Sequence, residues 1–228
     1  MKKTISFQTK DDVKIVGDFY EAKGPIPACA GMAQADRKSI LLLHILPGNR
    51  GDFNEFAEFL WQKGYNVLNI DERGHGDSEA WSGETGSWQE FTQADYDRMI
   101  YDVEAAAQWL KNRIPETELA LIGGSIGANI AMIFGAKCQP KIIIALSPGI
   151  DYSGIKTEIA SRNYRQNLLI VASRDDNYSF ESSEKLFEIS KASHKEFIRY
   201  EDAGHGTRMF DAEPELKQRI LDFLNKNF

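Results

Sequence analysis

The chain has 228 residues, a formal net charge of −7, and 42% hydrophobic and 27% charged residues. A chain of this length buries roughly 70% of its unfolded surface in one core, so we expect a single domain over residues 1–228. The acidic balance and the lack of a long Lys/Arg cluster argue against a nucleic-acid or anionic-membrane surface, because phosphate binding needs concentrated positive charge. We expect a neutral or uncharged partner instead.

The N-terminal sequence and the two cysteines bear on the cellular compartment. Lys2 and Lys3 resemble the start of a signal peptide, but the residues that follow alternate in polarity and contain no continuous apolar core. No apolar run approaches the ~18 residues of a membrane span. Cys29 and Cys138 lack the spacing of a metal or redox site. These features predict a cytoplasmic protein, and a leader that had been removed would leave the same pattern.

The order of predicted elements indicates the fold class. Residues up to 19 alternate in polarity around the turn Lys10-Asp11-Asp12, which predicts an antiparallel hairpin. From Ser39 onward, β-type runs alternate with helical ones. The expected strands span 39–44, 66–70, 118–122, 141–146, 168–172 and 196–200, and the expected helices span 53–63, 95–112, 126–136, 181–191 and 214–227. This alternation predicts an α/β fold: a mostly parallel central sheet with an N-terminal antiparallel hairpin and helices on both faces.

A serine lies between one of these strands and the next helix. The apolar run 119–122 enters Gly123-Gly-Ser125-Ile-Gly127, and a helical segment follows. A G-x-S-x-G turn in this context exposes a serine hydroxyl as a nucleophile, and the small residues permit a sharp reversal of the backbone. The amide of Ile126 begins the helix and is one candidate oxyanion donor.

A serine nucleophile needs a base and an orienting carboxylate, and both follow in order. The strand 168–172 leads into Asp175 and Asp176, and the strand 196–200 leads into His205 within a glycine-flanked loop. In a parallel sheet these loops lie at the carboxyl ends of the strands, where active sites gather.

Five motifs in this order resemble those of the α/β-hydrolase superfamily, in particular its lidless serine esterase and dienelactone-hydrolase-like branch. They are the oxyanion-loop-like run 42–52, the D-x-R-G-x-G-x-S segment 71–78, the elbow at Ser125, the acid loop at Asp175-Asp176 and the histidine loop 203–206. The resemblance implies a second oxyanion donor at the amide of Leu46. The chain has His44-Ile45 where the family usually has His-Gly, so a donor one residue away stays open.

The resemblance favours Asp176 as the orienting carboxylate. The family commonly reads D-x-x followed by a small or apolar residue, and Asp176 fits this pattern with Ser173 at the turn. Asp175 is the main alternative and Asp151, after the preceding strand, is a remote third. The predicted catalytic set is therefore Ser125, Asp176 and His205.

Loop lengths bear on the substrate. Only residues 147–167 separate two strands at the place where many relatives insert a helical lid, so no large lid is expected. The loop 72–93 carries Trp81 and Trp88, which are candidate substrate-binding residues in an apolar acyl wall. Simple packing of that loop is the competing interpretation.

The remaining histidines and motifs do not indicate a metal or cofactor. His44 and His75 are expected to make structural hydrogen bonds, and His194 to lie on the surface. No H-E-x-x-H pattern, strand-following G-x-G-x-x-G or P-loop lysine motif occurs. The predicted reaction needs no cofactor.

We therefore predict a carboxylesterase that cleaves small-molecule esters of short or medium acyl groups through an acyl-enzyme. Thioester or lactone cleavage and acyl transfer would use the same residues. A hydrolase-fold receptor that binds a ligand with negligible turnover is an alternative of a different class. No heptad or exposed apolar stripe indicates an oligomeric state.

Overall fold

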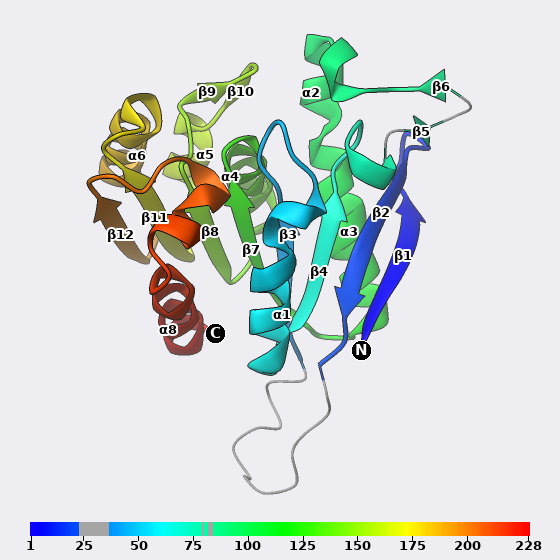
Figure 1. Ribbon diagram of the computed structural model, residues 1–228, viewed down its shortest axis with the longest axis horizontal. Helices are drawn as coiled ribbons and strands as arrows, with labels where there is room; N and C mark the ends of the chain where they lie inside the picture. Colours follow the sequence, from blue (N-terminus) through cyan, green and yellow to red (C-terminus); the bar gives the residue numbers. More distant parts are fainter. Residues whose placement is uncertain (23–36, 79, 82–83) are drawn as a thin grey trace, which may run out of the picture.

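Figure 1 shows the protein, a computed structural model, as a central sheet flanked by helices. The structure describes residues 1–22, 37–78, 80–81 and 84–228, and the side chains of 80–81 and 84–85 are outside the description. The strands are β1 (Lys2–Gln8), β2 (Lys14–Tyr20), β3 (Lys38–Leu43), β4 (Asn66–Asp71), β5 (Ala80–Trp81), β6 (Glu84–Thr85), β7 (Glu118–Gly124), β8 (Ile142–Leu146), β9 (Asp151–Tyr152), β10 (Ile155–Lys156), β11 (Asn167–Ser173) and β12 (His194–Tyr200). The α-helices are α1 (Asn54–Gln62), α2 (Gln93–Arg98), α3 (Ile100–Arg113), α4 (Ile126–Cys138), α5 (Glu158–Asn163), α6 (Asn177–Ile189), α7 (Met209–Ala212) and α8 (Leu216–Asn227).

Among the described residues, the main sheet has eight strands in the order β1-β2-β4-β3-β7-β8-β11-β12. β1 and β2 form the antiparallel hairpin, β2 is antiparallel to β4, and the six strands β4, β3, β7, β8, β11 and β12 run parallel to one another. The predicted fold class is confirmed. Because β7 is central, the loops after β3 and β8 flank the loop that carries Ser125.

Two apolar layers cover the two faces of the sheet. Alternate residues of each parallel strand enter opposite layers, as Leu41 and Leu42 do in β3. One layer packs against α3, α4, α5 and α6, and the other against α1, α7 and α8. Burial on both faces explains why these strands read as continuous apolar runs.

The single helix predicted over 95–112 is wrong, because the structure has two helices there, α2 and α3. The amide of Met99 bonds to the carbonyl of Tyr96, and the amide of Asp102 bonds to the carbonyl of Met99. These i to i+3 bonds tighten the turn and end α2. Helix α2 also starts earlier than predicted, because Thr92 and Asp95 form a capping box.

The connection between β8 and β11 consists of the β9–β10 hairpin and the short helix α5. Asn129 of α4 ties this hairpin to the helix that follows Ser125: its side chain donates to the carbonyl of Ile155 at 2.8 Å and accepts from the amide of Gly149 at 3.0 Å. The hairpin is therefore fixed to the body of the protein. Within the described part of the chain, no helix is long and apolar enough to cross a bilayer.

Candidate active site

Ser125 lies at a sharp turn between β7 and α4, with φ 54° and ψ −120°. A residue with a side chain adopts this conformation only when its surroundings hold it there. The Ser125 amide donates to the carbonyl of Leu146 at 2.8 Å, and the Ser125 carbonyl accepts from the amides of Ala128 and Asn129. The turn therefore presents the Ser125 side chain, 6% exposed, at the carboxyl end of the sheet.

Gly127, two residues after Ser125, is required because the backbone of α4 approaches the end of β3 closely there. A Cβ on Gly127 would lie 2.5 Å from the carbonyl oxygens of both Leu43 and His44. No side chain fits in that space. The first turn of α4 thus packs directly on the end of β3, which brings the loop after β3 beside Ser125.

His205 and Asp176 meet above the ends of two neighbouring strands. The Nδ1 atom of His205 lies 2.6 Å from Oδ2 of Asp176, and both side chains are partly exposed. Ser179 Oγ lies 3.3 Å from the same nitrogen. Burial tends to raise the pKa of Asp176, but its hydrogen bonds with His205 and Ser179 outweigh this and lower it. A charged Asp176 can therefore orient the imidazole and stabilise its protonated form.

The alternative carboxylates make other contacts. Asp175 accepts hydrogen bonds from the amides of Ala203 and Gly204 and from the hydroxyl of Ser173, which joins the acid loop to the histidine loop. Asp151 Oδ1 accepts from the amide of Gly154 within the β9–β10 hairpin. The structure brings Asp176 to His205 and uses Asp175 and Asp151 within loops.

The predicted oxyanion donors lie on the two loops that meet at Ser125. Leu46 is half-buried in the loop after β3, and Ile126 is the first residue of α4. Within the described part of the chain, the Leu46 amide donates no hydrogen bond. Amides in the first turn of a helix have no partner inside the helix. Both donor assignments stay predictions.

Ile45 occupies the position where the family pattern has glycine, and its side chain fills the space beneath these loops. A Cβ on Gly124 would lie 2.6 Å from Cγ2 of Ile45, and a Cβ on Gly206 would lie 2.7 Å from the same atom. Ile45 thus packs against the residue before Ser125 and the residue after His205. Its size requires glycine at both positions.

We expect Gly124→Ala to destabilise the protein by about 1–3 kcal/mol, because the new methyl group overlaps Ile45. Ile45→Ala removes the obstructing atom, so the double variant should lose less stability than the sum of the two single variants. Urea unfolding of the four proteins measures this coupling. Strict additivity would contradict the contact.

The segment 71–78 braces the loop after β3. The backbone amide of Arg50 donates to Oδ1 of Asp71 at 2.7 Å, and the Arg50 guanidinium pairs with Asp71 and with Asp18. His44 Nδ1 donates to the carbonyl of Ile45 at 2.8 Å, and its Nε2 accepts from the amide of Glu72 at 3.1 Å. Burial lowers the pKa of His44 to about 3, so it stays neutral. Its contacts agree with the structural role predicted from sequence.

Of the two tryptophans predicted to bind substrate, Trp88 packs on the 71–78 segment. The Trp88 ring stacks on His75 with centroids 5.8 Å apart and an interplanar angle of 5°, and its amide donates to the carbonyl of Gly74. These contacts belong to packing of the loop on the 71–78 segment. The side chain of Trp81 lies outside the described residues.

His194 is partly exposed and pairs with Glu196.

Sequence reasoning missed Tyr152, which the β9–β10 hairpin brings into the site. Its hydroxyl lies 2.7 Å from Ser179 Oγ and 3.4 Å from the carbonyl of Ser147. Its ring is perpendicular to that of His205, with centroids 6.2 Å apart. The available signal was a tyrosine soon after the predicted strand 141–146, in the short segment that replaces a lid.

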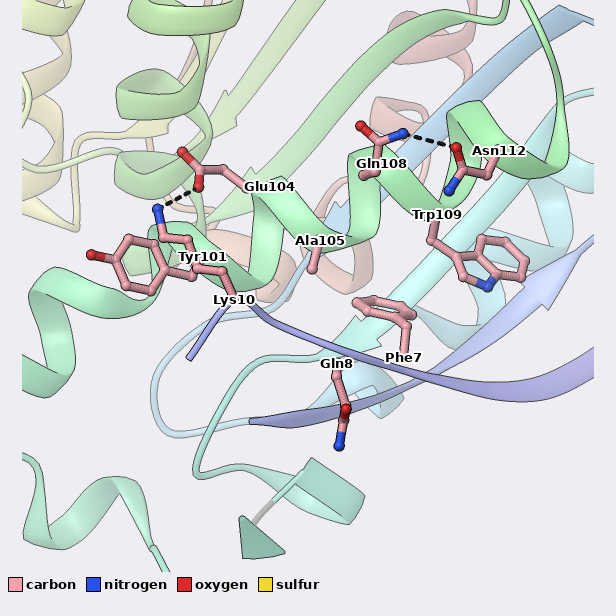
Figure 2. A pocket seen from close by; sticks show the side chains of 9 residues that line it. All are labelled: Phe7, Gln8, Lys10, Tyr101, Glu104, Ala105, Gln108, Trp109 and Asn112. Carbon is pink, nitrogen blue, oxygen red and sulfur yellow. Dashed lines mark hydrogen bonds and ion pairs between the residues drawn. The ribbon is translucent and has the colours of Figure 1, made fainter. Parts of the chain in front are cut away.

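A separate hollow of about 330 Å³ lies between β1 and α3 (Figure 2). The Phe7 and Trp109 rings stack at one end, and Lys10 pairs with Glu104 at the other. None of Ser125, Asp176 and His205 lines it. Among the described residues, no cluster of three His, Cys, Asp or Glu side chains is suited to a metal ion.

Comparisons with known proteins bear on the family and the fold. The family model described as "Serine aminopeptidase, S33" matches residues 34–162. The lysophosphatidylserine lipase ABHD12 of Xenopus tropicalis is 26% identical over 81% of this chain and 57% of its own length, so the chain spans little more than half of that relative.

Solved structures share the fold. The esterase Pf2001 of Pyrococcus furiosus has a TM-score of 0.79 and 23% identity, over 99% of this chain and 92% of that one. XC6422 of Xanthomonas campestris, described as an α/β serine hydrolase without a lid, has a TM-score of 0.73 and 18% identity, over 99% of this chain and 94% of that one.

Proposed function

The chain belongs to the α/β-hydrolase family described as serine aminopeptidase, S33, and we propose that it is a serine hydrolase that cleaves carboxylic esters of short or medium acyl groups. The observation that carries the proposal is the pairing of His205 with Asp176 at 2.6 Å, beside a serine held at φ 54° between a strand and a helix. This combination of a strained serine, a histidine and a carboxylate is the arrangement that activates a hydroxyl for attack on a carbonyl.

In the proposed cycle, Nε2 of His205 accepts the Ser125 proton as Oγ attacks the ester carbonyl. Asp176 stabilises the imidazolium that forms. The amides of Leu46 and Ile126 bind the oxyanion, each contributing on the order of 3 kcal/mol in comparable sites. His205 then protonates the departing alcohol, and water releases the acyl group by the reverse sequence. This chemistry uses no cofactor.

Three carboxylates on the loops after β8 and β11 already have hydrogen-bond partners, which favours an ester over a peptide with a free amino terminus. An aminopeptidase must bind the α-ammonium group of its substrate, which calls for a carboxylate that is free to pair with it. Asp176 pairs with His205, Asp175 accepts two backbone amides, and Asp151 accepts the amide of Gly154. An ester substrate carries no α-ammonium group, so the site needs no such carboxylate.

Fluorophosphonate labelling combined with a substrate panel tests the proposal. We expect labelling of Ser125, located by peptide mass spectrometry, and turnover of p-nitrophenyl esters. The panel also contains a thioester, a lactone, an aminoacyl p-nitroanilide and a lysophospholipid. Labelling without turnover of any of them would favour a receptor, and preference for the anilide would favour a peptidase. Absence of both labelling and turnover would reject the function.

We expect the ester rate to fall for long acyl chains and to change smoothly across the micellar threshold. The physical reason is that the segment over the site is a short hairpin held by Asn129 and by Tyr178, whose hydroxyl bonds to the backbone of Asp151. Initial rates against substrate concentration, with a soluble short ester as control, measure this. A sharp rate increase at the threshold would mean that the hairpin opens as a lid.

A further inference from the structure

The hydroxyl of Tyr152 lies beside the pair formed by Asp176 and His205, and the proposed cycle leaves it without a role. It contacts Ser179, whose Oγ in turn reaches Nδ1 of His205. Burial raises the pKa of Tyr152 to about 12, while the hydrogen bond with Ser179 and the nearby side chain of Ser125 act in the opposite direction. The phenol therefore contacts the residue beside the base, faces the ring of His205, and keeps its proton at neutral pH.

The sheet order determines on which side of Ser125 this hydroxyl acts. β3 and β8 are the two neighbours of β7, so the loop that carries Leu46 and the hairpin that carries Tyr152 approach Ser125 from opposite sides. Of the predicted oxyanion donors, Leu46 lies in the loop after β3, and the first turn of α4, which begins with Ile126, packs on the end of β3. Tyr152 is on the side of β11 and β12, the strands that lead to Asp176 and His205. An alcohol that leaves from the tetrahedral intermediate takes its proton from the histidine, so it must be on the histidine side as well.

Surrounding contacts hold the Tyr152 ring in place. It packs edge-on against Tyr178, with centroids 5.6 Å apart, and perpendicular to His205. Ser147, whose carbonyl faces the Tyr152 hydroxyl, also accepts a hydrogen bond from the amide of Gly206 through its Oγ at 2.9 Å. A donor that is fixed before substrate binds needs little reorganisation to act on developing charge.

We propose that Tyr152 is a further catalytic residue, whose hydroxyl donates a hydrogen bond to the alcohol oxygen of the ester as the bond between that oxygen and the acyl carbon breaks. This assignment rests on the proposed function. The electron pair of the breaking bond goes to the alcohol oxygen, and the proton that neutralises it comes from His205. Tyr152 keeps its own proton and stabilises the partial negative charge through the hydrogen bond alone.

This role predicts a dependence on the leaving group. A p-nitrophenolate leaves with its charge delocalised and needs little help, whereas an alkoxide concentrates its charge on one oxygen. Ethyl butyrate and p-nitrophenyl butyrate share an acyl group and differ only in the alcohol. The ratio kcat/KM reports steps up to acylation for both, so deacylation does not mask the effect.

The experiment compares Tyr152→Phe with the unaltered protein on these two esters. We expect kcat/KM to fall at least about tenfold for ethyl butyrate, as for loss of a hydrogen bond to a charged group, and less than about threefold for p-nitrophenyl butyrate. Tyr178→Phe is the matched control, because it removes a hydroxyl that bonds to the backbone of Asp151 in the same hairpin and should leave the ratio of the two rates unchanged. Fluorophosphonate labelling of Ser125 should persist in both variants, which shows that the elbow is folded.

Other outcomes would overturn the role. Equal losses on both esters would assign Tyr152 to support of the triad, and unchanged rates would leave the hydroxyl without a catalytic part. Faster labelling of Tyr152→Phe would mean that the tyrosine restrains Ser125. If the unaltered protein were neither labelled nor active on either ester, the proposed function would fail and the role of Tyr152 with it. If the unaltered protein is active on p-nitrophenyl butyrate and Tyr152→Phe leaves the ratio of the two ester rates unchanged, only the catalytic role of Tyr152 is refuted.

Discussion

Ser125→Ala is expected to lower ester turnover by about five to six orders of magnitude, the scale seen when a triad nucleophile is removed. The alanine methyl group cannot attack a carbonyl, and no acyl-enzyme can form. Residual hydrolysis would come from the oxyanion amides and from substrate binding alone. Turnover of p-nitrophenyl butyrate measures the loss, and fluorophosphonate labelling should vanish with it.

The matched control for this variant is Ser193→Ala. Ser193 is an exposed serine between α6 and β12, and its hydroxyl bonds to the carbonyl of Gln166. We expect this variant to keep full activity and labelling. Retention of labelling in Ser125→Ala would show that another residue is the nucleophile. Retained labelling in the Ser193 variant alone, with loss in the Ser125 variant, is the expected pattern.

Asp176→Asn should lower kcat by about four orders of magnitude, because an amide in this position holds the imidazole in the wrong tautomer. In the structure the carboxylate of Asp176 accepts from Nδ1 of His205 at 2.6 Å, which leaves Nε2 as the base. The amide of asparagine would donate to Nδ1 instead, and Nε2 would carry the proton. The loss should therefore appear in kcat with KM nearly unchanged.

Asp175→Asn is the matched control one residue away. Its side-chain oxygen would still accept from the amides of Ala203 and Gly204, so we expect turnover within about threefold of the unaltered protein and a loss of stability of about 1 kcal/mol. Steady-state kinetics and urea unfolding of both variants measure these effects. A large kinetic loss in Asp175→Asn with a small one in Asp176→Asn would exchange the two assignments.

The elbow was predictable from sequence because its requirements are local. A glycine, a serine and a glycine at alternate positions between an apolar run and a helical run leave few conformations other than a tight turn. The order of the later loops followed from the alternation of strands and helices, which determines a parallel sheet and places successive loops at one edge. The confirmed fold and the meeting of His205 with Asp176 both depend on this pattern.

Contacts between distant segments were not predictable in the same way. Asp175 and Asp176 are adjacent and chemically alike, so their chemistry alone does not distinguish them; the family resemblance favoured Asp176, and the packing of the histidine loop shows that Asp176 faces His205. The break at Met99 depends on how α2 and α3 pack, because the apolar spacing continues across it.

By itself, the sequence determined the class of fold, the strained serine turn and the order in which base and acid follow it, since each depends on residues close together in the chain. Only the tertiary structure decided that Asp175 is held by the backbone of the histidine loop, that Trp88 packs on His75, and that Tyr152 enters the site. Tyr152 meets Ser179 across 27 residues of chain, and a contact at that separation is determined by the register of the sheet and the packing of loops. Such long-range contacts leave no periodic pattern in the sequence.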